Sequence, residues 1–350
     1  MVASYYPGHC FNGGIMADDT IARPYLLFLG TAPSNLWAKT AHGVAHWRPE
    51  WCVGQSGLPG CEADVGLETM TIEAAVERGA KSLVIGVAPH GGIMPPDWSE
   101  TLIAALAAGL DIAAGLHTRL AEVPEIAAAA QAHGRRLIDV RHPNRDFDLA
   151  EPERRTGKRL LTVGTDCCVG KMFAALSIER EMRAQGMNAD FRATGQTGIF
   201  IAERGISVDA VVSDFLSGAA AWLTPPNDPD HWDVVEGQGS LFHVSYAGVS
   251  LGLLHGSQPD ALVLCHDAGR DWNDDFPEVK LPSLEDCAAA NLAAARISNP
   301  DVRLAGIALN TSALAPDEAK RVLADAEDRL GVPCADPVAT GVKNIVEGLK

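Results

Sequence analysis

The chain has 350 residues, of which 47% are hydrophobic, and an excess of Asp and Glu over Lys and Arg gives it a formal net charge of −17. This length favours two domains over one, and the charge excludes non-specific binding to nucleic acid or an anionic membrane, because their phosphates would be repelled. The N-terminus lacks the basic and apolar regions of a secretory signal. We therefore expect a cytoplasmic protein that acts on a small molecule.

The first half of the chain alternates short apolar runs with Ala-rich segments. We expect residues 1–20 to be a flexible extension and residues 21–145 to form the first domain. Short apolar runs suit buried parallel strands, Ala favours helix, and their alternation predicts a Rossmann-like, doubly wound α/β sheet. The predicted strands are Tyr25–Gly30, Ser82–Val87, Asp111–Gly115 and Arg136–Val140, and the predicted helices lie near Thr71–Arg78, Ser99–Ala108 and Pro124–Ala132.

A charged segment, Arg141–Arg159, interrupts this alternation with two prolines and ten charged residues. We interpret residues 146–158 as a linker and residues 159–350 as a second α/β domain. Ligands of open α/β sheets bind at the carboxyl ends of the strands, so we expect the functional site at those ends. The predicted strands are Leu160–Gly164, Ala189–Gly195, Ala210–Phe215, Asp233–Ser240, Ala261–Asp267 and Leu304–Asn310.

One motif, VGTDCCVGK, predicts a phosphate-binding loop between a strand and a helix that starts at Lys171. Glycines let successive N–H groups point inward, the helix N-terminus adds partial positive charge, and the lysine adds a full one. Five residues separate the two glycines, where the common P-loop pattern has four, and this spacing resembles the loop of dethiobiotin synthetase. The predicted cofactor-binding residues are Gly164, Thr165, Asp166, Cys167, Cys168, Val169, Gly170, Lys171 and Met172.

Met172 stands where an ATP-hydrolysing P-loop has a Ser or Thr that ligates Mg²⁺. A thioether is a poor ligand for that hard cation, so the loop is expected to hold phosphates without cleaving them, and Mg²⁺ is not expected to be essential. Coenzyme A, which contains a phosphorylated ADP group, fits such a loop. Thr165, Asp214 and Glu236 remain alternatives for holding a metal.

Polar residues at the other predicted strand ends are candidates for the rest of the site. The stretch EGQGS resembles the EGxGG stretch of dethiobiotin synthetase, which follows a strand facing the phosphates, so Glu236 would contact the ligand directly. A buried carboxylate at a strand end also needs a partner. Asp214 is predicted to be either a base or a helix N-cap. Among His243, His255 and His266 we favour His255 as a base. We expect TGQTG, which contains Gln196, to lie beside the phosphate loop and to line the ligand's path, and Asn310 is a candidate for reading a purine edge.

The first domain offers groups for a second substrate. Gly91 and Gly92, in APHGGIMP, are predicted to form one wall of an interdomain cleft. Lys39 and Arg192, with Arg48 and Arg141, are the cations that could hold a carboxylate. No metal site is predicted: His42 and His46 have helical spacing but no evident third ligand, and no two of the eight cysteines are spaced as CxxC.

Taken together, PYLLFLG, VGTDCCVGKM, TGQTGI, VSDFLSGAA and VEGQGSL resemble the DgcN-type family, long classed as a domain of unknown function. The resemblance covers nearly the whole chain from about Ile21. It implies an N-acetyltransferase that moves acetyl from acetyl-CoA to a D-amino acid, D-glutamate above all, in D-amino-acid catabolism. Gly164–Lys171 and Asn310 would anchor the coenzyme, and Glu236, Asp214 or His255 would act as the base. Enzymes of this architecture often assemble symmetrically, so a homo-oligomer is expected.

Three other functions stay open. An ATP-dependent ligase or kinase of the dethiobiotin synthetase type would bind MgATP and release ADP. A non-catalytic metabolite sensor would bind nucleotide without turnover. An NAD-dependent oxidoreductase is disfavoured because no GxGxxG follows a predicted strand. A covalent acyl intermediate on Cys167 or Cys168 is also disfavoured, because their position in a phosphate loop suggests that they contribute backbone donors.

Overall fold

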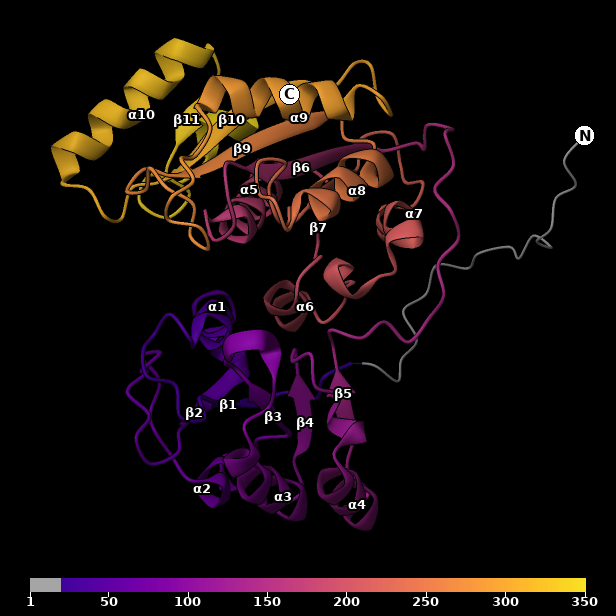
Figure 1. Cartoon of the computed structure of the whole chain (residues 1–350), viewed down its shortest axis with the longest axis vertical. Helices are drawn as coiled ribbons and strands as arrows, with labels where there is room; N and C mark the ends of the chain where they lie inside the picture. Colours follow the sequence, from indigo (N-terminus) through magenta and orange to yellow (C-terminus); the bar gives the residue numbers. More distant parts are fainter. Residues whose placement is uncertain (1–19) are drawn as a thin grey trace, which may run out of the picture.

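A computed structural model describes residues 20–350, so the predicted extension falls almost entirely outside the described residues. The chain builds two parallel sheets, one above the other in Figure 1. The first sheet has the strand order β2-β1-β3-β4-β5. Its strands are β1 (Tyr25–Phe28), β2 (Cys52–Ser56), β3 (Ser82–Ile85), β4 (Asp111–Ala114) and β5 (Leu137–Asp139), and its helices are α1 (Lys39–Trp47), α2 (Ile72–Glu77), α3 (Ser99–Ala107) and α4 (Pro124–His133).

The second sheet has the order β11-β10-β9-β6-β8-β7, again all parallel. Between β5 of the first sheet and β6, which is the first strand of the second sheet along the chain, there is no helix or strand. The strands are β6 (Lys158–Gly164), β7 (Ala189–Arg192), β8 (Trp232–Val235), β9 (Ala261–Asp267), β10 (Arg303–Asn310) and β11 (Cys334–Ala335). The helices are α5 (Lys171–Ala184), α6 (Gln196–Ala202), α7 (Ser213–Leu223), α8 (Ala247–Ser257), α9 (Leu284–Ala295), α10 (Pro316–Leu330) and α11 (Lys343–Glu347).

The cores of both domains explain why short apolar runs became strands. β1, β3 and β4 are buried at every position, and so are the first five residues of β9. Parallel strands covered by helices on both faces have no solvent side, so they carry continuous apolar runs instead of alternating ones. This predicted class, a Rossmann-like domain followed by a P-loop-type α/β domain, is confirmed.

One predicted strand is wrong, and two observed strands carried no clear signal. Residues 210–215 form the end of a 3₁₀ turn and the start of α7, because the buried positions that follow, Leu216, Ala219, Ala220 and Leu223, repeat with helical spacing. Asp214 therefore lies exposed in the first turn of a helix and not at a strand end. The missed strands are β2, whose sequence CVGQS is half polar, and β11, which has two residues.

The strand order also corrects one expectation about the site. TGQTG was placed beside the phosphate loop, but β8 lies between β6 and β7. The residues after β8, beginning with Glu236, are thus nearer to the loop than the residues after β7. Within TGQTG, Thr194 and Gly195 precede α6, and residues 196–198 form its start.

The two domains meet through α1 and α6, which lie between the sheets in Figure 1. The Thr40 and Thr197 hydroxyls are 3.1 Å apart, and Arg48 Nε donates to the Ile201 carbonyl at 3.1 Å. A Cβ on Gly43 would lie 2.6 Å from Thr197 Cγ2, so the two helices approach as closely as a glycine allows. The carboxyl ends of β3, β4 and β5 point toward the second domain (Figure 1).

No helix within residues 20–350 is both long enough and apolar enough to cross a membrane.

Arg155 holds the segment between the domains in place, so we expect its replacement to cost more stability than replacement of its neighbour Arg154. Arg155 donates to the Thr224 carbonyl at 2.9 Å and the Gly256 carbonyl at 2.7 Å, whereas Arg154 forms an exposed ion pair with Asp260. Arg155→Ala leaves carbonyls without donors and should lower the free energy of unfolding by about 1–3 kcal/mol. Arg154→Ala should cost less than about 1 kcal/mol. Denaturant unfolding checks both, and equal losses would contradict this account.

Candidate active site

The predicted phosphate loop joins β6 to α5, with helix starting at Lys171 as expected. Gly170 has φ +92°, a conformation that glycine adopts without strain. Cys168 has φ +54°, which is uncommon for a residue with a side chain. Lys171 is buried, and its Nζ donates to the Asp166 carbonyl at 2.7 Å. A buried ammonium whose hydrogen bond goes to an uncharged carbonyl can still bind an incoming anion strongly.

Contacts from β9 and the segment that follows it hold the loop in shape. Thr165 Oγ1 and His266 Nδ1 are 2.9 Å apart, and Arg270 Nη2 donates to the Cys167 carbonyl at 2.7 Å. The carboxylate of Asp166, fully buried, accepts from Asn273 Nδ2 at 2.8 Å and from the Asp274 N–H at 2.9 Å. The loop is therefore organised before a ligand arrives, which lowers the entropy cost of binding.

Met172 and Phe173 face the N-terminal domain. A Cβ on Gly43 would lie 3.3 Å from Met172 Cε, and the Phe173 ring centroid is 5.2 Å from that of His46 and 5.7 Å from that of Trp47. The position that carries the Mg²⁺-binding hydroxyl in ATP-hydrolysing loops thus belongs to the domain interface. Its chemistry and its packing both oppose a metal role.

Glu236, directly after β8, is the one candidate base that lies beside the loop. Its Oε2 accepts from the Thr194 N–H at 2.9 Å and the Gly195 N–H at 3.1 Å. Burial raises the pKa of Glu236 to about 7, against the opposing effects of these N–H groups and of Lys171. A carboxyl group with that pKa can take up a proton near neutral pH, as a general base must.

The two other candidate bases lie on helices away from these contacts. Asp214 is exposed on α7. His255 is half-buried in the last turn of α8, and its Nε2 has no hydrogen-bond partner among residues 20–350. Neither residue has a contact with the loop in the described part of the chain.

The amide side chains predicted to bind cofactor already have partners. Gln196 donates to the Gly115 carbonyl at 2.7 Å and accepts from Arg141 Nη2 at 3.3 Å, so it joins the two domains. Asn310, at the end of β10, donates to Asp267 Oδ2 at 3.2 Å and accepts from the Ser312 N–H at 3.1 Å. A purine that uses Asn310 must compete with these contacts.

The residues predicted to bind a second substrate are spread over both domains. Lys39, at the start of α1, lies with its Nζ 3.8 Å from Cys168 Sγ. Gly91 and Gly92 form a 3₁₀ turn after β3, both with positive φ, and the Gly92 carbonyl accepts the N–H of His117 at 2.8 Å. These residues lie at the carboxyl edge of the first sheet, which faces the second domain.

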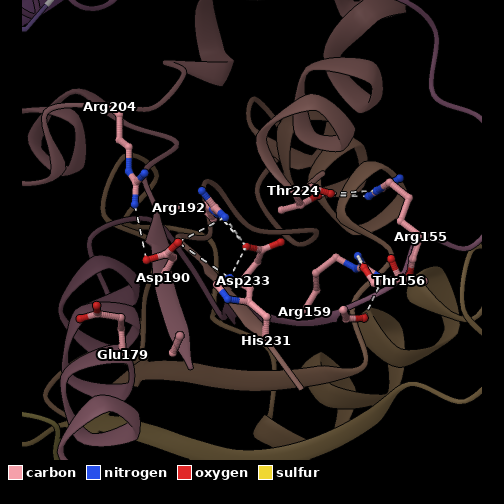
Figure 2. Close-up of polar contacts among 12 residues, drawn as sticks. Arg155, Thr156, Arg159, Glu179, Asp190, Arg192, Arg204, Thr224, His231 and Asp233 are labelled. Atoms are coloured by element: carbon pink, nitrogen blue, oxygen red, sulfur yellow. Dashed lines mark hydrogen bonds and ion pairs between the residues drawn. The ribbon is translucent and has the colours of Figure 1, made fainter. Parts of the chain in front are cut away.

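Arg192 lies on β7, an edge strand of the second sheet, and its guanidinium already forms an ion pair with Asp233. Its Nη2 is 2.6 Å from Asp233 Oδ1 and 3.6 Å from Asp190 Oδ2, and Figure 2 shows its guanidinium between the two carboxylates. A cavity of about 1140 Å³ opens beside it, between α7 and the linker residues 146–156. A substrate carboxylate would have to displace Asp233, which is 1% exposed.

One cluster in the described residues, Asp166, Cys167 and His243, brings metal-ligating atoms within 4.8 Å of one another. His243 Nδ1 accepts the Ser245 N–H at 3.2 Å, so in the neutral ring the proton is on Nε2, which lies 3.2 Å from Asp275 Oδ2. Coordination of a metal through Nε2 would move the ring proton to Nδ1, where it would face the Ser245 N–H donor. That hydrogen bond disfavours a metal at this cluster without a rearrangement of the His243 ring or of residue 245.

This fold and loop define a two-domain protein that pairs a Rossmann-like domain with a P-loop domain. Family comparison agrees: the P-loop domain of DUF1611, described as a domain of unknown function, matches residues 147–346, and its Rossmann-like N-terminal domain matches residues 56–143. A crystal structure of a DUF1611 family protein from Anabaena variabilis superimposes with a TM-score of 0.85 at 31% identity, covering 94% of this chain and 99% of that one. The chain belongs to the DUF1611 family.

Two relatives carry a functional name. Proteins from Tritonibacter scottomollicae and from a Pseudoalteromonas species, both named D-glutamate N-acetyltransferase, are 50% and 45% identical to this chain over 329 residues. Each alignment covers 94% of this chain and 99% of the relative. The chain is an acyltransferase, and more narrowly an N-acetyltransferase.

Gly198, in α6, tests the position of Glu236. A Cβ on Gly198 would overlap Glu236 Oε2, whereas a Cβ on Gly248, in α8, meets nothing within 4 Å. Gly198→Ala should therefore displace the carboxylate and lower kcat at least about tenfold, since small misplacements of a catalytic group are costly. Gly248→Ala should keep wild-type kcat and gain up to about 1 kcal/mol in stability. An active Gly198→Ala enzyme would mean that the position of Glu236 is unimportant.

Proposed function

We propose that this protein transfers the acetyl group of acetyl-CoA to the amine of D-glutamate. The support is the near full-length similarity to two proteins of that name, together with a phosphate loop whose magnesium position is Met172. The loop suits a coenzyme whose phosphates are a handle and are not transferred.

The residues of the loop fit the diphosphate of such a coenzyme. Gly170 and the first turn of α5 supply N–H groups, and Lys171 supplies a buried positive charge. When the diphosphate binds, Lys171 Nζ can exchange the Asp166 carbonyl for a phosphate oxygen, which makes a stronger, charge-assisted hydrogen bond. These groups bind and orient the coenzyme, and its thioester supplies the acetyl group.

The acetyl transfer needs one proton acceptor on the protein. D-glutamate arrives as an ammonium, Glu236 takes its proton, and the free amine attacks the thioester carbonyl. The new C–N bond forms and the C–S bond breaks. The nitrogen then loses a second proton, which binds the sulfur of the leaving thiolate, so that coenzyme A leaves as the thiol. Glu236 lies near Lys171, because a Cβ on the next residue, Gly237, would be 3.1 Å from Lys171 Cδ. For Glu236 to act on the amine, the thioester end of the coenzyme must therefore fold back toward the phosphate loop.

Direct transfer is favoured over an acetyl-cysteine. Burial raises the pKa of Cys167 to about 11, against the lowering effect of Lys171. At neutral pH Cys167 is therefore almost entirely the thiol, and the thiolate is the nucleophilic form. Within residues 20–350 no side chain forms a hydrogen bond with the Cys167 thiol, and the Nδ1 lone pair of nearby His243 accepts the Ser245 N–H, so no base is in place to take the thiol proton.

The overall reaction is tested by thiol release. With acetyl-CoA and D-glutamate we expect release of free coenzyme A, with activity retained when EDTA removes divalent cations, because Met172 leaves no hydroxyl for Mg²⁺. L-Glutamate, D-aspartate and D-alanine serve as comparison acceptors. ADP formation from MgATP with no thiol release from any amine would instead indicate the ligase or kinase.

The base is tested by pH dependence. Glu236 acts only when ionised, and its raised pKa of about 7 predicts that kcat/KM falls about tenfold for each pH unit below 7 and levels off above it. Glu236→Gln should remove this acid limb and lower kcat about 10²-fold or more while acetyl-CoA still binds. Lys171→Ala should instead weaken coenzyme binding. If Glu236→Gln keeps wild-type kcat, the base is another residue.

A further inference from the structure

Lys39 belongs to the N-terminal domain, but its ammonium lies against the phosphate loop of the other domain. Its Nζ is 3.8 Å from Cys168 Sγ, and its side chain is exposed. Among residues 20–350 it forms no ion pair with a carboxylate, although the chain carries a net charge of −17. An unpaired ammonium beside an anion-binding loop points to a negatively charged ligand.

The close packing of α1 sets the position of Lys39. One turn along the helix, a Cβ on Gly43 would lie 2.6 Å from Thr197 Cγ2 and 3.3 Å from Met172 Cε. On the loop side, Cys168 is held at φ +54°, a conformation that costs energy in a residue with a side chain and tends to persist at functional sites. Both partners of the Lys39–Cys168 contact are thus constrained by the backbone.

We propose that Lys39 is a second phosphate-binding lysine, which joins Lys171 in holding the diphosphate of the coenzyme. The inference rests on the proposed function. A diphosphate esterified at both ends carries two negative charges, and Lys171 supplies only one positive charge. The other cation at the loop, Arg270, lies within 4.0 Å of the carboxylates of Asp166, Asp267 and Asp274. Lys39 supplies the missing charge.

This assignment gives the N-terminal domain a role in coenzyme binding. The Asp166 and Glu236 carboxylates already lie near the loop, so an unbalanced diphosphate would be repelled. Because Lys39 is on α1, the phosphate site is complete only when α1 is packed against α5 and α6. The sequence placed Lys39 among groups for the acceptor carboxylate, and its position beside the loop assigns it to the phosphates instead.

The test is direct binding of two probes, coenzyme A and ADP, to Lys39→Met, Lys39→Arg and wild-type enzyme by calorimetry. Loss of a charge-assisted hydrogen bond should weaken both probes about tenfold or more in Lys39→Met, with most of the affinity restored in Lys39→Arg. The loss should shrink at high ionic strength because the contact is exposed. Lys81→Met is the matched control: Lys81 is an exposed lysine of the same domain at the amino end of β3, and its removal should change neither affinity.

A second variant tests the dependence on α1. Gly43→Ala keeps the lysine but pushes α1, and Lys39 with it, away from Thr197 and Met172. It should therefore also weaken coenzyme A binding, while circular dichroism shows the fold intact. Wild-type affinity for coenzyme A and ADP in Lys39→Met would overturn the proposal, and so would a raised KM for the amine alone. If the wild-type enzyme binds ADP but not coenzyme A, the proposed function fails, and the ADP measurements still decide the role of Lys39. If it binds neither, both proposals fail.

Discussion

The packing of α1 against the first turns of α5 and α6 is the contact on which the rest of the structure depends. Gly43 permits it, since any side chain there would meet Thr197 and Met172. The contact places Lys39 beside the phosphate loop and positions the start of α6. The turn before α6 supplies the two N–H groups that hold Glu236. One helix–helix contact thereby connects the first domain to both halves of the candidate site.

The same contact accounts for the loop's departure from the ATP-hydrolysing pattern. Met172 and Phe173 are apolar because they pack on α1 of the first domain. Full burial of such a side chain contributes roughly 1.5–3 kcal/mol, and half-buried Met172 and Phe173 each contribute part of that to the interface. A Ser or Thr would give up this packing for a metal-binding hydroxyl. Packing on α1 and ligating a metal therefore exclude each other at these positions. A loop without the metal-binding hydroxyl is suited to binding phosphates but not to transferring them.

Glu236 shows how the site tolerates a buried carboxyl group. Desolvation raises its pKa, and the N–H groups of Thr194 and Gly195 limit the rise, so that it titrates near neutral pH. There is little space around it: a side chain at Gly195 would collide with Gln238, and a side chain at Gly198 would collide with Glu236 itself. The glycines of TGQTG are therefore needed for close approach, beyond any role in a turn.

Local patterns allowed much of the fold to be predicted from the sequence. Apolar runs identified most of the strands, and glycine spacing followed by lysine identified the loop, because both depend on residues close together in the chain. The strand predicted at 210–215 failed because a short apolar run is compatible with either a strand or a helix, and the helical repeat of Leu216, Ala219 and Ala220 decided the outcome. Glu236 was recognisable from EGQGS, but its partners were not.

The sequence by itself thus determined the two-domain α/β class, the loop and the unsuitability of Met172 as a magnesium ligand, since these follow from local stereochemistry and from side-chain chemistry. Only the tertiary structure decided that Arg192 is paired with Asp233, that Arg270 and His266 support the loop, and that Lys39 reaches it from another domain. Those contacts join residues 41 to 129 positions apart. Such pairs form when distant elements pack, and no local pattern encodes which of many charged residues will meet.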